Sequence, residues 1–213
     1  MSQSHIGTEA ESDGGVVAAG HPMEVEAGLH ILASGGNAFD ALVAAAFMGY
    51  VVEPAMCGVG GYGRLSAFDA RRGELIAVDH YLRAPGAARP DMFEIDEAKG
   101  LKYYETPYTK GLKAERGPLA AAVPGAVAGL YWTQRHLGRL AWHKVLEPAI
   151  AAARAGLEVS WALYMSSRRT SRASAPIRRA LLSSFQRAGC PALAARSSRR
   201  SASISATLRA RWS

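Results

Sequence analysis

Apolar residues follow a helical pattern in the first part of the chain, and glycine pairs separate the segments. The helical pattern begins at Pro22, a residue that fits the first position of a helix, and Gly35-Gly36 ends it. Asn37 is placed to cap a second helix, which is almost entirely apolar from Ala38 to Tyr50 and has Asp40 as its only charge. We therefore expect the second helix to be central and buried.

Alternation and turn residues predict the other elements. A short buried strand is expected at residues 14–19, and residues 64–69 and 74–80 should form a hairpin with a four-residue loop. Residues 84–118 contain four prolines and predict a long loop region, which is followed by helices at residues 126–136 and 142–155. Buried helices mixed with a hairpin indicate an α+β layered fold.

The glycine-dense segment from Gly58 to Gly63 matches the dinucleotide-binding pattern GxGxxG. That pattern holds a pyrophosphate when a strand precedes the glycines and a helix follows, because the helix N-terminus then faces the phosphates. Here a predicted helix precedes the glycines and a predicted strand follows. We interpret the segment as a buried helix-to-strand corner, where the glycines supply positive φ and room for close backbone packing, and we expect no cofactor.

The charge of the chain is concentrated at one end. The net charge is +7, but residues 166–213 contain 11 Arg and no acidic residue, so residues 1–165 carry −4. We divide the chain into a loose N-terminus (1–13), a globular region (14–165) and an Arg/Ser/Ala-rich tail (166–213). The tail is either an arm that binds nucleic acid through its phosphates or an out-of-frame, disordered translation, and we favour the second interpretation.

Few side chains in the globular region are candidates for chemistry. Cys57 precedes the glycines and could form a thiolate near free amides, but no pattern pairs it with a histidine, and a small buried cysteine is the commoner case. Asp40 and Asp79 are interpreted as hydrogen-bonding groups at a helix end and a strand end. The spacing of the histidines is not that of metal ligands, which makes a metal site unexpected at His21, His80, His136 and His143.

Targeting features are not visible in the sequence. No apolar run reaches the ~18 residues that a membrane span needs, and the first 15 residues have neither the basic nor the apolar part of a signal peptide. Two cysteines, Cys57 and Cys190, make neither a disulfide framework nor a metal cluster. We expect a cytoplasmic protein with no membrane partner.

Seven blocks of the sequence follow one another in the order found in a known family: GHPMEVEAGLHILASGGNAFDALVAAAFMGYVVEP, CGVGGYG, FDARRG, AVDHYLRAP, PDMF, AAVPGAVAGLYW and LGRLAWHKVLEPAIAAARAG. Over about residues 14–163 the chain resembles the gamma-glutamyltransferase family. The resemblance implies an N-terminal nucleophile hydrolase, an αββα sandwich built from one precursor that cuts itself. Only the large-subunit portion is covered, so the sandwich should be incomplete.

The resemblance also implies an activity. The cut exposes a threonine whose own amine is the general base for its hydroxyl, and the enzyme transfers or hydrolyses gamma-glutamyl groups, as in glutathione. Relatives include cephalosporin acylases, so the expected substrate is a small gamma-glutamyl or acyl-amide compound. The nucleophile belongs to the small subunit, far beyond residue 213. We therefore expect no catalytic residue in this chain, a missing small subunit as partner, and no activity from the chain alone; the alternative is a non-catalytic protein with a nucleic-acid-binding tail.

The substrate-binding candidates implied by the resemblance are Arg83 and Tyr81. Family members typically read D-x-R-E-x-A-P where residues 79–85 read DHYLRAP, and their Arg grips the glutamyl α-carboxylate. Tyr81 occupies that position here, and tyrosine cannot form a bidentate pair with a carboxylate. Positions i and i+2 share a face of a strand, so Arg83 could supply the lost charge. The alternative is that Arg83 is an exposed loop residue.

Overall fold

The computed structural model describes residues 11–157, 159, 161 and 163–166. Most of the N-terminal segment 1–13 and almost all of the tail 166–213 lie outside these residues, so the structural predictions made for both segments stay predictions. The described residues form two compact units. The helical unit contains residues 11–58 and the described residues from 138 onward, and the hairpin unit contains residues 59–137.

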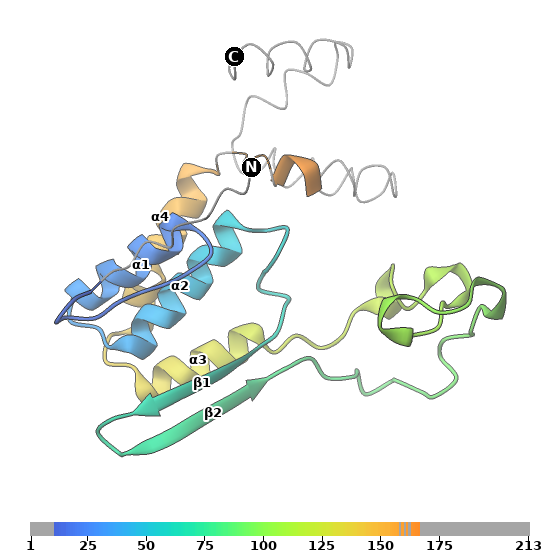
Figure 1. Ribbon diagram of the computed structural model, residues 1–213, viewed down its shortest axis with the longest axis horizontal. Helices are drawn as coiled ribbons and strands as arrows, with labels where there is room; N and C mark the ends of the chain where they lie inside the picture. The colour runs from blue at the N-terminus through green and yellow to red at the C-terminus, as the bar shows by residue number, and fades with distance from the viewer. Residues whose placement is uncertain (1–10, 158, 160, 162, 167–213) are drawn as a thin grey trace, which may run out of the picture. The chain divides into compact units, whose positions relative to one another are not determined.

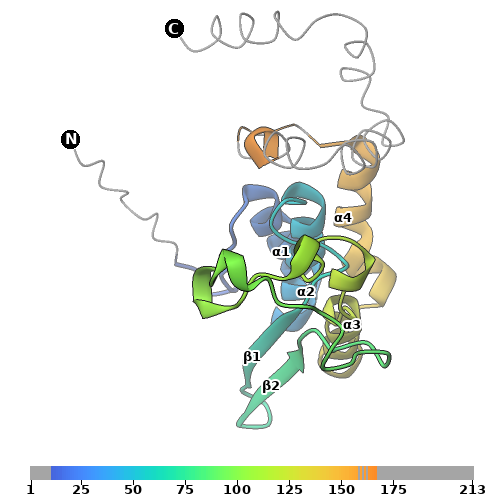
Figure 2. The same ribbon diagram turned by 90° about the vertical axis from the view of Figure 1, so that its right-hand side faces the viewer.

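Three helices make up the helical unit. They are α1 (Pro22–Ala33), α2 (Ala38–Val52) and α4 (Trp142–Ala155), and both α1 and α4 pack against α2 (Figures 1 and 2). Ala27, Met48 and Val52 form a buried cluster between them, with partly buried apolar neighbours around it. The helices predicted from the sequence are confirmed, and α2 is two residues longer than predicted.

The start of α2 shows why this helix is fixed in its place. The Asn37 side chain accepts hydrogen bonds from the amides of Phe39 and Asp40, both at 3.0 Å, which confirms the predicted cap. Asp40 is fully buried, and its Oδ2 accepts from the Asn37 amide at 3.0 Å and from the Arg139 amide at 2.8 Å. A buried carboxylate thus ties the beginning of α2 to the turn before α4, as expected for a structural hydrogen-bonding group.

The hairpin unit is built from two strands and one helix. The strands β1 (Gly63–Asp69) and β2 (Glu74–His80) pair antiparallel from Gly63 opposite His80 to Asp69 opposite Glu74, around the predicted four-residue loop. Helix α3 (Ala126–Leu137) packs against β2 (Figure 1). Between β2 and α3 the chain follows the predicted long loop region, which contains four single-turn 3-10 helices at Glu97–Lys99, Tyr103–Glu105, Lys110–Leu112 and Pro118–Ala120.

One predicted strand is absent. Residues 14–19 form no strand and are mostly exposed, with Val16 in contact with solvent, so the prediction of a short buried strand there is wrong. A strand is stabilised by a partner, and within the described part of the chain β1 and β2 pair only with each other. The run of small and β-branched residues therefore has nothing to pair with.

The glycine corner also differs in part from its interpretation. The helix-then-strand order is confirmed, but residues 58–63 are half-buried or exposed, and none of their glycines has positive φ. Close packing is the reason at Gly63, where a Cβ atom would lie 2.5 Å from the His80 ring. The Gly61 carbonyl accepts from the amides of Gly125 and Ala126 at 3.2 and 3.1 Å, so the corner closes the N-terminus of α3.

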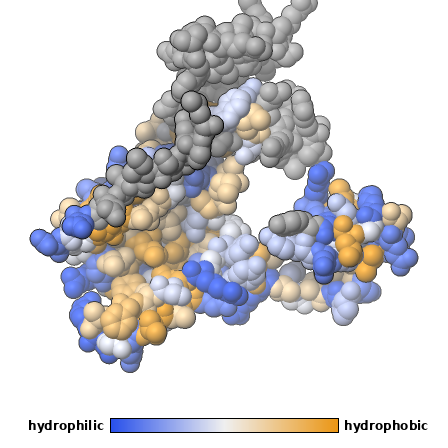
Figure 3. Space-filling view, viewed as in Figure 1, coloured by the Kyte–Doolittle hydropathy of each residue, from blue (hydrophilic) through white to orange (hydrophobic). Residues whose placement is uncertain are grey.

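Apolar side chains gather among hydrophilic ones on the hairpin (Figure 3), and Leu75 is 85% exposed. Among the described residues, no helix combines the length and the apolar character of a membrane span.

The mixture of helices and strands confirms the α+β class.

Candidate functional site

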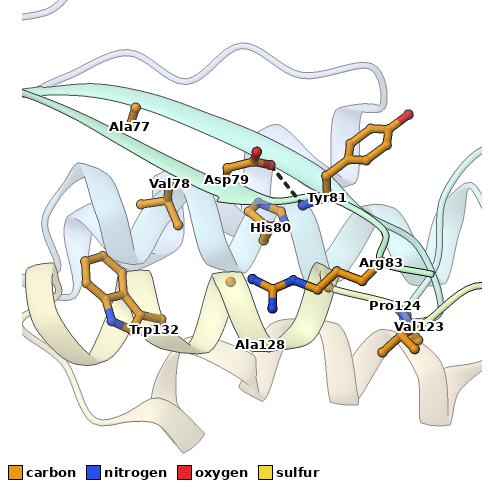
Figure 4. A pocket seen from close by; sticks show the side chains of 12 residues that line it. Ala77, Val78, Asp79, His80, Tyr81, Arg83, Val123, Pro124, Ala128 and Trp132 are labelled. Carbon is orange, nitrogen blue, oxygen red and sulfur yellow. Dashed lines mark hydrogen bonds between the residues drawn. The ribbon is translucent and has the colours of Figure 1, made fainter. Parts of the chain in front are cut away.

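A hollow of about 460 Å³ lies in the hairpin unit, between the end of β2 and the N-terminal half of α3 (Figure 4). Volumes of this size are typical of pockets that hold small molecules. The walls are formed by the last residues of β2, the segment just after it, and the residues that lead into α3. The lining includes the side chains of Val78, Asp79, His80, Tyr81, Arg83, Val123, Pro124, Ala128 and Trp132.

Backbone hydrogen bonds fix the segment that follows β2. The Arg83 amide donates to the Val123 carbonyl at 3.2 Å, and the Val123 amide donates to the Arg83 carbonyl at 2.9 Å. The Tyr81 amide donates to Asp79 Oδ1 at 3.1 Å, which confirms Asp79 as a hydrogen-bonding group at a strand end. These contacts hold residues 81–83 beside the segment that opens α3, although β2 itself ends at His80.

Glycines allow close packing around His80, two from the side of α3 and one from β1. A Cβ atom at Gly129 would lie 2.2 Å from the His80 Cβ, and one at Gly125 would lie 2.3 Å from the His80 carbonyl oxygen. Gly63 contacts the imidazole from the neighbouring strand. Since real Cβ atoms do not approach other atoms so closely, each position requires glycine, and together they set the narrow spacing at the base of the hollow.

Arg83 is the cation of this site. Its side chain is exposed and points into the hollow (Figure 4). Within the described part of the chain, no ion pair or hydrogen bond is made by its guanidinium. An unpaired guanidinium beside apolar walls is suited to bind a carboxylate through two parallel hydrogen bonds.

Tyr81 is directed away from Arg83 (Figure 4). Its ring packs against Tyr62, with ring centroids 4.3 Å apart, and the Arg64 guanidinium lies 5.1 Å from its centroid. Arg64 also pairs with Asp79 at 3.5 Å, and the hydrogen bond with the Tyr62 side chain raises the pKa of Tyr81. The expectation that positions 81 and 83 share a strand face is wrong, because β2 ends at His80 and its alternation stops there.

The other candidates from the sequence do not form a second site. Cys57 is exposed rather than buried, and partial desolvation of its thiol together with the carboxylates of Glu24 and Glu53 raises its pKa, which disfavours the thiolate. No group of three or more His, Cys, Asp or Glu side chains among the described residues is arranged to hold a metal ion.

Trp132, Val123 and His80 were not identified as lining residues from the sequence. The signal that could have found them is the block AAVPGAVAGLYW. Its two glycines are four residues apart, with Gly125 directly before α3 and Gly129 in its first turn. Such spacing indicates that another backbone packs closely there. It does not indicate which strand does so.

Comparison with known proteins identifies the family. The sequence profile described as gamma-glutamyltranspeptidase matches residues 25–193. The chain therefore belongs to the gamma-glutamyltranspeptidase family. The profile match continues past residue 166, where the Arg-rich tail begins.

Individual relatives agree with this assignment. The glutathione hydrolase proenzyme of Bacillus subtilis is 35% identical over 145 residues, 68% of this chain and 23% of that protein. The acylase ACY 1 proenzyme of Pseudomonas sp. (strain V22) is 38% identical over 146 residues, 68% of this chain and 25% of that protein. The crystal structure of Helicobacter pylori gamma-glutamyltranspeptidase matches with a TM-score of 0.65 and 32% identity, over 76% of this chain and 44% of that one. The chain thus spans about a quarter of the length of these two curated relatives.

Proposed function

We propose that this chain is the large-subunit region of an enzyme that transfers or hydrolyses gamma-glutamyl groups or cleaves a related acyl amide. Membership of the gamma-glutamyltranspeptidase family supports the reaction class. The observation that carries the binding role is the Arg83 guanidinium, which pairs with no carboxylate among the described residues and points into a hollow large enough for a small molecule. We assign Arg83 to the carboxylate of the donor substrate, and Tyr81 to the adjoining wall.

The nucleophile of the proposed reaction comes from elsewhere. By family resemblance it is an N-terminal threonine of a small subunit, whose amine takes the proton of its own hydroxyl as the hydroxyl attacks the donor carbonyl. Two relatives are named proenzymes, which supports a precursor that is processed. In this proposal β1, β2 and α3 form part of an αββα sandwich that the small-subunit segment completes, and the present chain alone turns over no substrate.

We propose that the tail is out of frame from about residue 166, although the match of the family profile as far as residue 193 favours a tail that is in frame. The gene sequence near Met165 tests this proposal, since a one-base correction should restore a long acidic frame that continues the family pattern. A frame that yields no such sequence after correction would favour a genuine Arg-rich extension, and with it the nucleic-acid-binding alternative.

A chimeric precursor tests the proposed function. The matched 145-residue segment of the Bacillus subtilis proenzyme is replaced by the corresponding segment of this chain, and release of 4-nitroaniline from gamma-glutamyl-4-nitroanilide is measured. We expect self-cleavage on a gel and turnover by the chimera, and no turnover by the 213-residue chain. Turnover by the chain alone would contradict the missing nucleophile, and a folded, self-cleaved chimera without turnover would contradict the assigned activity.

A further inference from the structure

The hollow contains an aromatic wall that the contact between Arg83 and a carboxylate does not use. Trp132 stacks on His136, with ring centroids 4.4 Å apart and planes inclined by 23°. The residue is nevertheless 44% exposed and lines the hollow. Its indole is therefore supported on one side by a neighbour on the same helix and remains accessible, which is the condition for stacking against a ligand ring.

The rest of the wall is largely apolar. Val78 lies on β2 and Ala128 lies on α3. Val123, whose backbone pairs with that of Arg83, and Pro124 lie just before α3. In Figure 4 the Arg83 side chain extends along the hollow toward the end where Trp132 stands. A single cation among apolar and aromatic side chains is complementary to a ligand with one negative group and one apolar group.

The other charged side chain of the lining does not compete with a ligand for Arg83. Asp79, the carboxylate of the lining, already accepts from the Tyr81 amide and pairs with Arg64. The Nδ1 atom of His80 is buried and has no hydrogen-bond partner among the described residues, so one polar group of the wall is still unsatisfied. An unsatisfied buried nitrogen costs free energy unless a ligand or a water pairs with it.

We propose that this hollow selects carboxylates that carry an aromatic group, with the carboxylate on Arg83 and the ring packed against Trp132. The proposal rests on the proposed function and narrows its substrate class. Among the gamma-glutamyl and acyl-amide donors of the proposed reaction, those with an aromatic group near the carboxylate are then preferred over unsubstituted ones.

The probe is 3-phenylpropanoate, titrated into the full 213-residue chain and followed by ligand-observed NMR. We expect binding on the order of millimolar or tighter, which is the range for a ligand of this size. Two matched probes separate the contacts: 3-phenylpropanamide lacks the charge and propanoate lacks the ring. Each should bind about tenfold more weakly, or worse, than the parent compound.

Two variants connect these losses to the residues. In Trp132→Ala the advantage of 3-phenylpropanoate over propanoate should disappear, and in Arg83→Gln its advantage over the amide should disappear. The control variant is Arg89→Gln, since Arg89 is an exposed arginine of the same loop region that pairs with Asp91. Binding by this control should equal that of the unchanged chain.

The outcomes distinguish this inference from the proposed function. A chain that binds propanoate and 3-phenylpropanoate equally well, or a Trp132→Ala variant that keeps the preference, overturns the aromatic selection even if the chimera is active. Absence of any binding overturns it as well. Selective, Trp132-dependent binding together with an inactive chimera supports the hollow as a ligand site and removes only the proposed reaction.

Discussion

The helical unit and the hairpin unit use their charged side chains in different ways. In the helical unit, Asp40 is fully buried, and its Oδ2 accepts hydrogen bonds from the backbone amides of Asn37 and Arg139. In the hairpin unit, Arg83 points into a hollow and, within the described residues, pairs with no carboxylate. Asp40 lies in the first turn of a helix and Arg83 lies just after a strand; one charge is satisfied by the fold, and the other is available to a ligand.

The different environments of Asp40 and Arg83 separate a charged residue that the fold requires from one that the fold does not require. A buried ion with complete hydrogen bonding is a requirement of folding, because it would otherwise cost several kcal/mol. A cation held over a hollow by two backbone hydrogen bonds adds nothing comparable to stability. In the proposed function, this cation binds the carboxylate of the donor.

The largest expected effect on stability is that of Asp40→Ala. This substitution leaves the partly buried amides of Asn37 and Arg139 without their acceptor, so we expect a loss of about 3 kcal/mol in the free energy of unfolding. Urea denaturation measures it. Asp79→Ala is the matched control, because that carboxylate is exposed and its ion pair with Arg64 is worth less than about 1 kcal/mol. Equal losses in the two variants would contradict the contrast between the units.

A second prediction concerns the close contact between β2 and α3. Helix propensity alone predicts that Gly129→Ala stabilises α3 by up to about 1 kcal/mol. The new methyl group would overlap the His80 side chain, so we expect instead a loss of about 2 kcal/mol. Gly86→Ala is the control, since nothing lies within 4 Å of the added atom, and it should change stability by less than about 0.5 kcal/mol. A stabilised Gly129→Ala variant would show that the glycine is not needed for packing.

The smallest effect is a pH dependence in the helical unit. Burial, the charge of Glu53 and a hydrogen bond with its side chain raise the pKa of Glu24 above its ordinary value of 4.5. Because the folded state holds this proton more tightly than the unfolded state, the stabilisation is complete below pH 4.5 and is lost as the pH rises through the folded pKa. Glu24→Gln should therefore melt at a higher temperature than the unchanged chain at neutral pH, with the difference shrinking toward pH 4. A constant difference across that range would contradict the raised pKa.

Most of the fold follows from local sequence features. The apolar run of α2, the cap at Asn37 and the four-residue hairpin loop each act over a few neighbouring residues, and each was predicted correctly. The prediction of a strand at residues 14–19 was wrong because strand formation depends on a partner strand, which the local sequence does not reveal. The length of α2 differed by two residues for a similar reason, since helix ends respond to the surrounding packing.

The candidate site was predictable only in its chemistry. Arg83 was a candidate because it lies two residues after the position where the family pattern has its arginine. The direction of its side chain could not be predicted from strand alternation, because β2 ends at His80. The partnership of Tyr81 with Tyr62 and Arg64 depends on the register of the hairpin. Trp132 joins the site through the packing of α3 on β2, a contact between segments about 50 residues apart in the sequence.

The most direct test of the assignment is the kcat/KM of the chimeric precursor for gamma-glutamyl-4-nitroanilide, with and without Arg83→Ala. If Arg83 pairs with the carboxylate of the donor, its removal should lower kcat/KM by the equivalent of about 2–5 kcal/mol. The Arg89→Ala chimera, which loses only an exposed ion pair with Asp91, should stay within about twofold. A decrease of less than about tenfold in Arg83→Ala would contradict the account and return Arg83 to the status of an exposed loop residue.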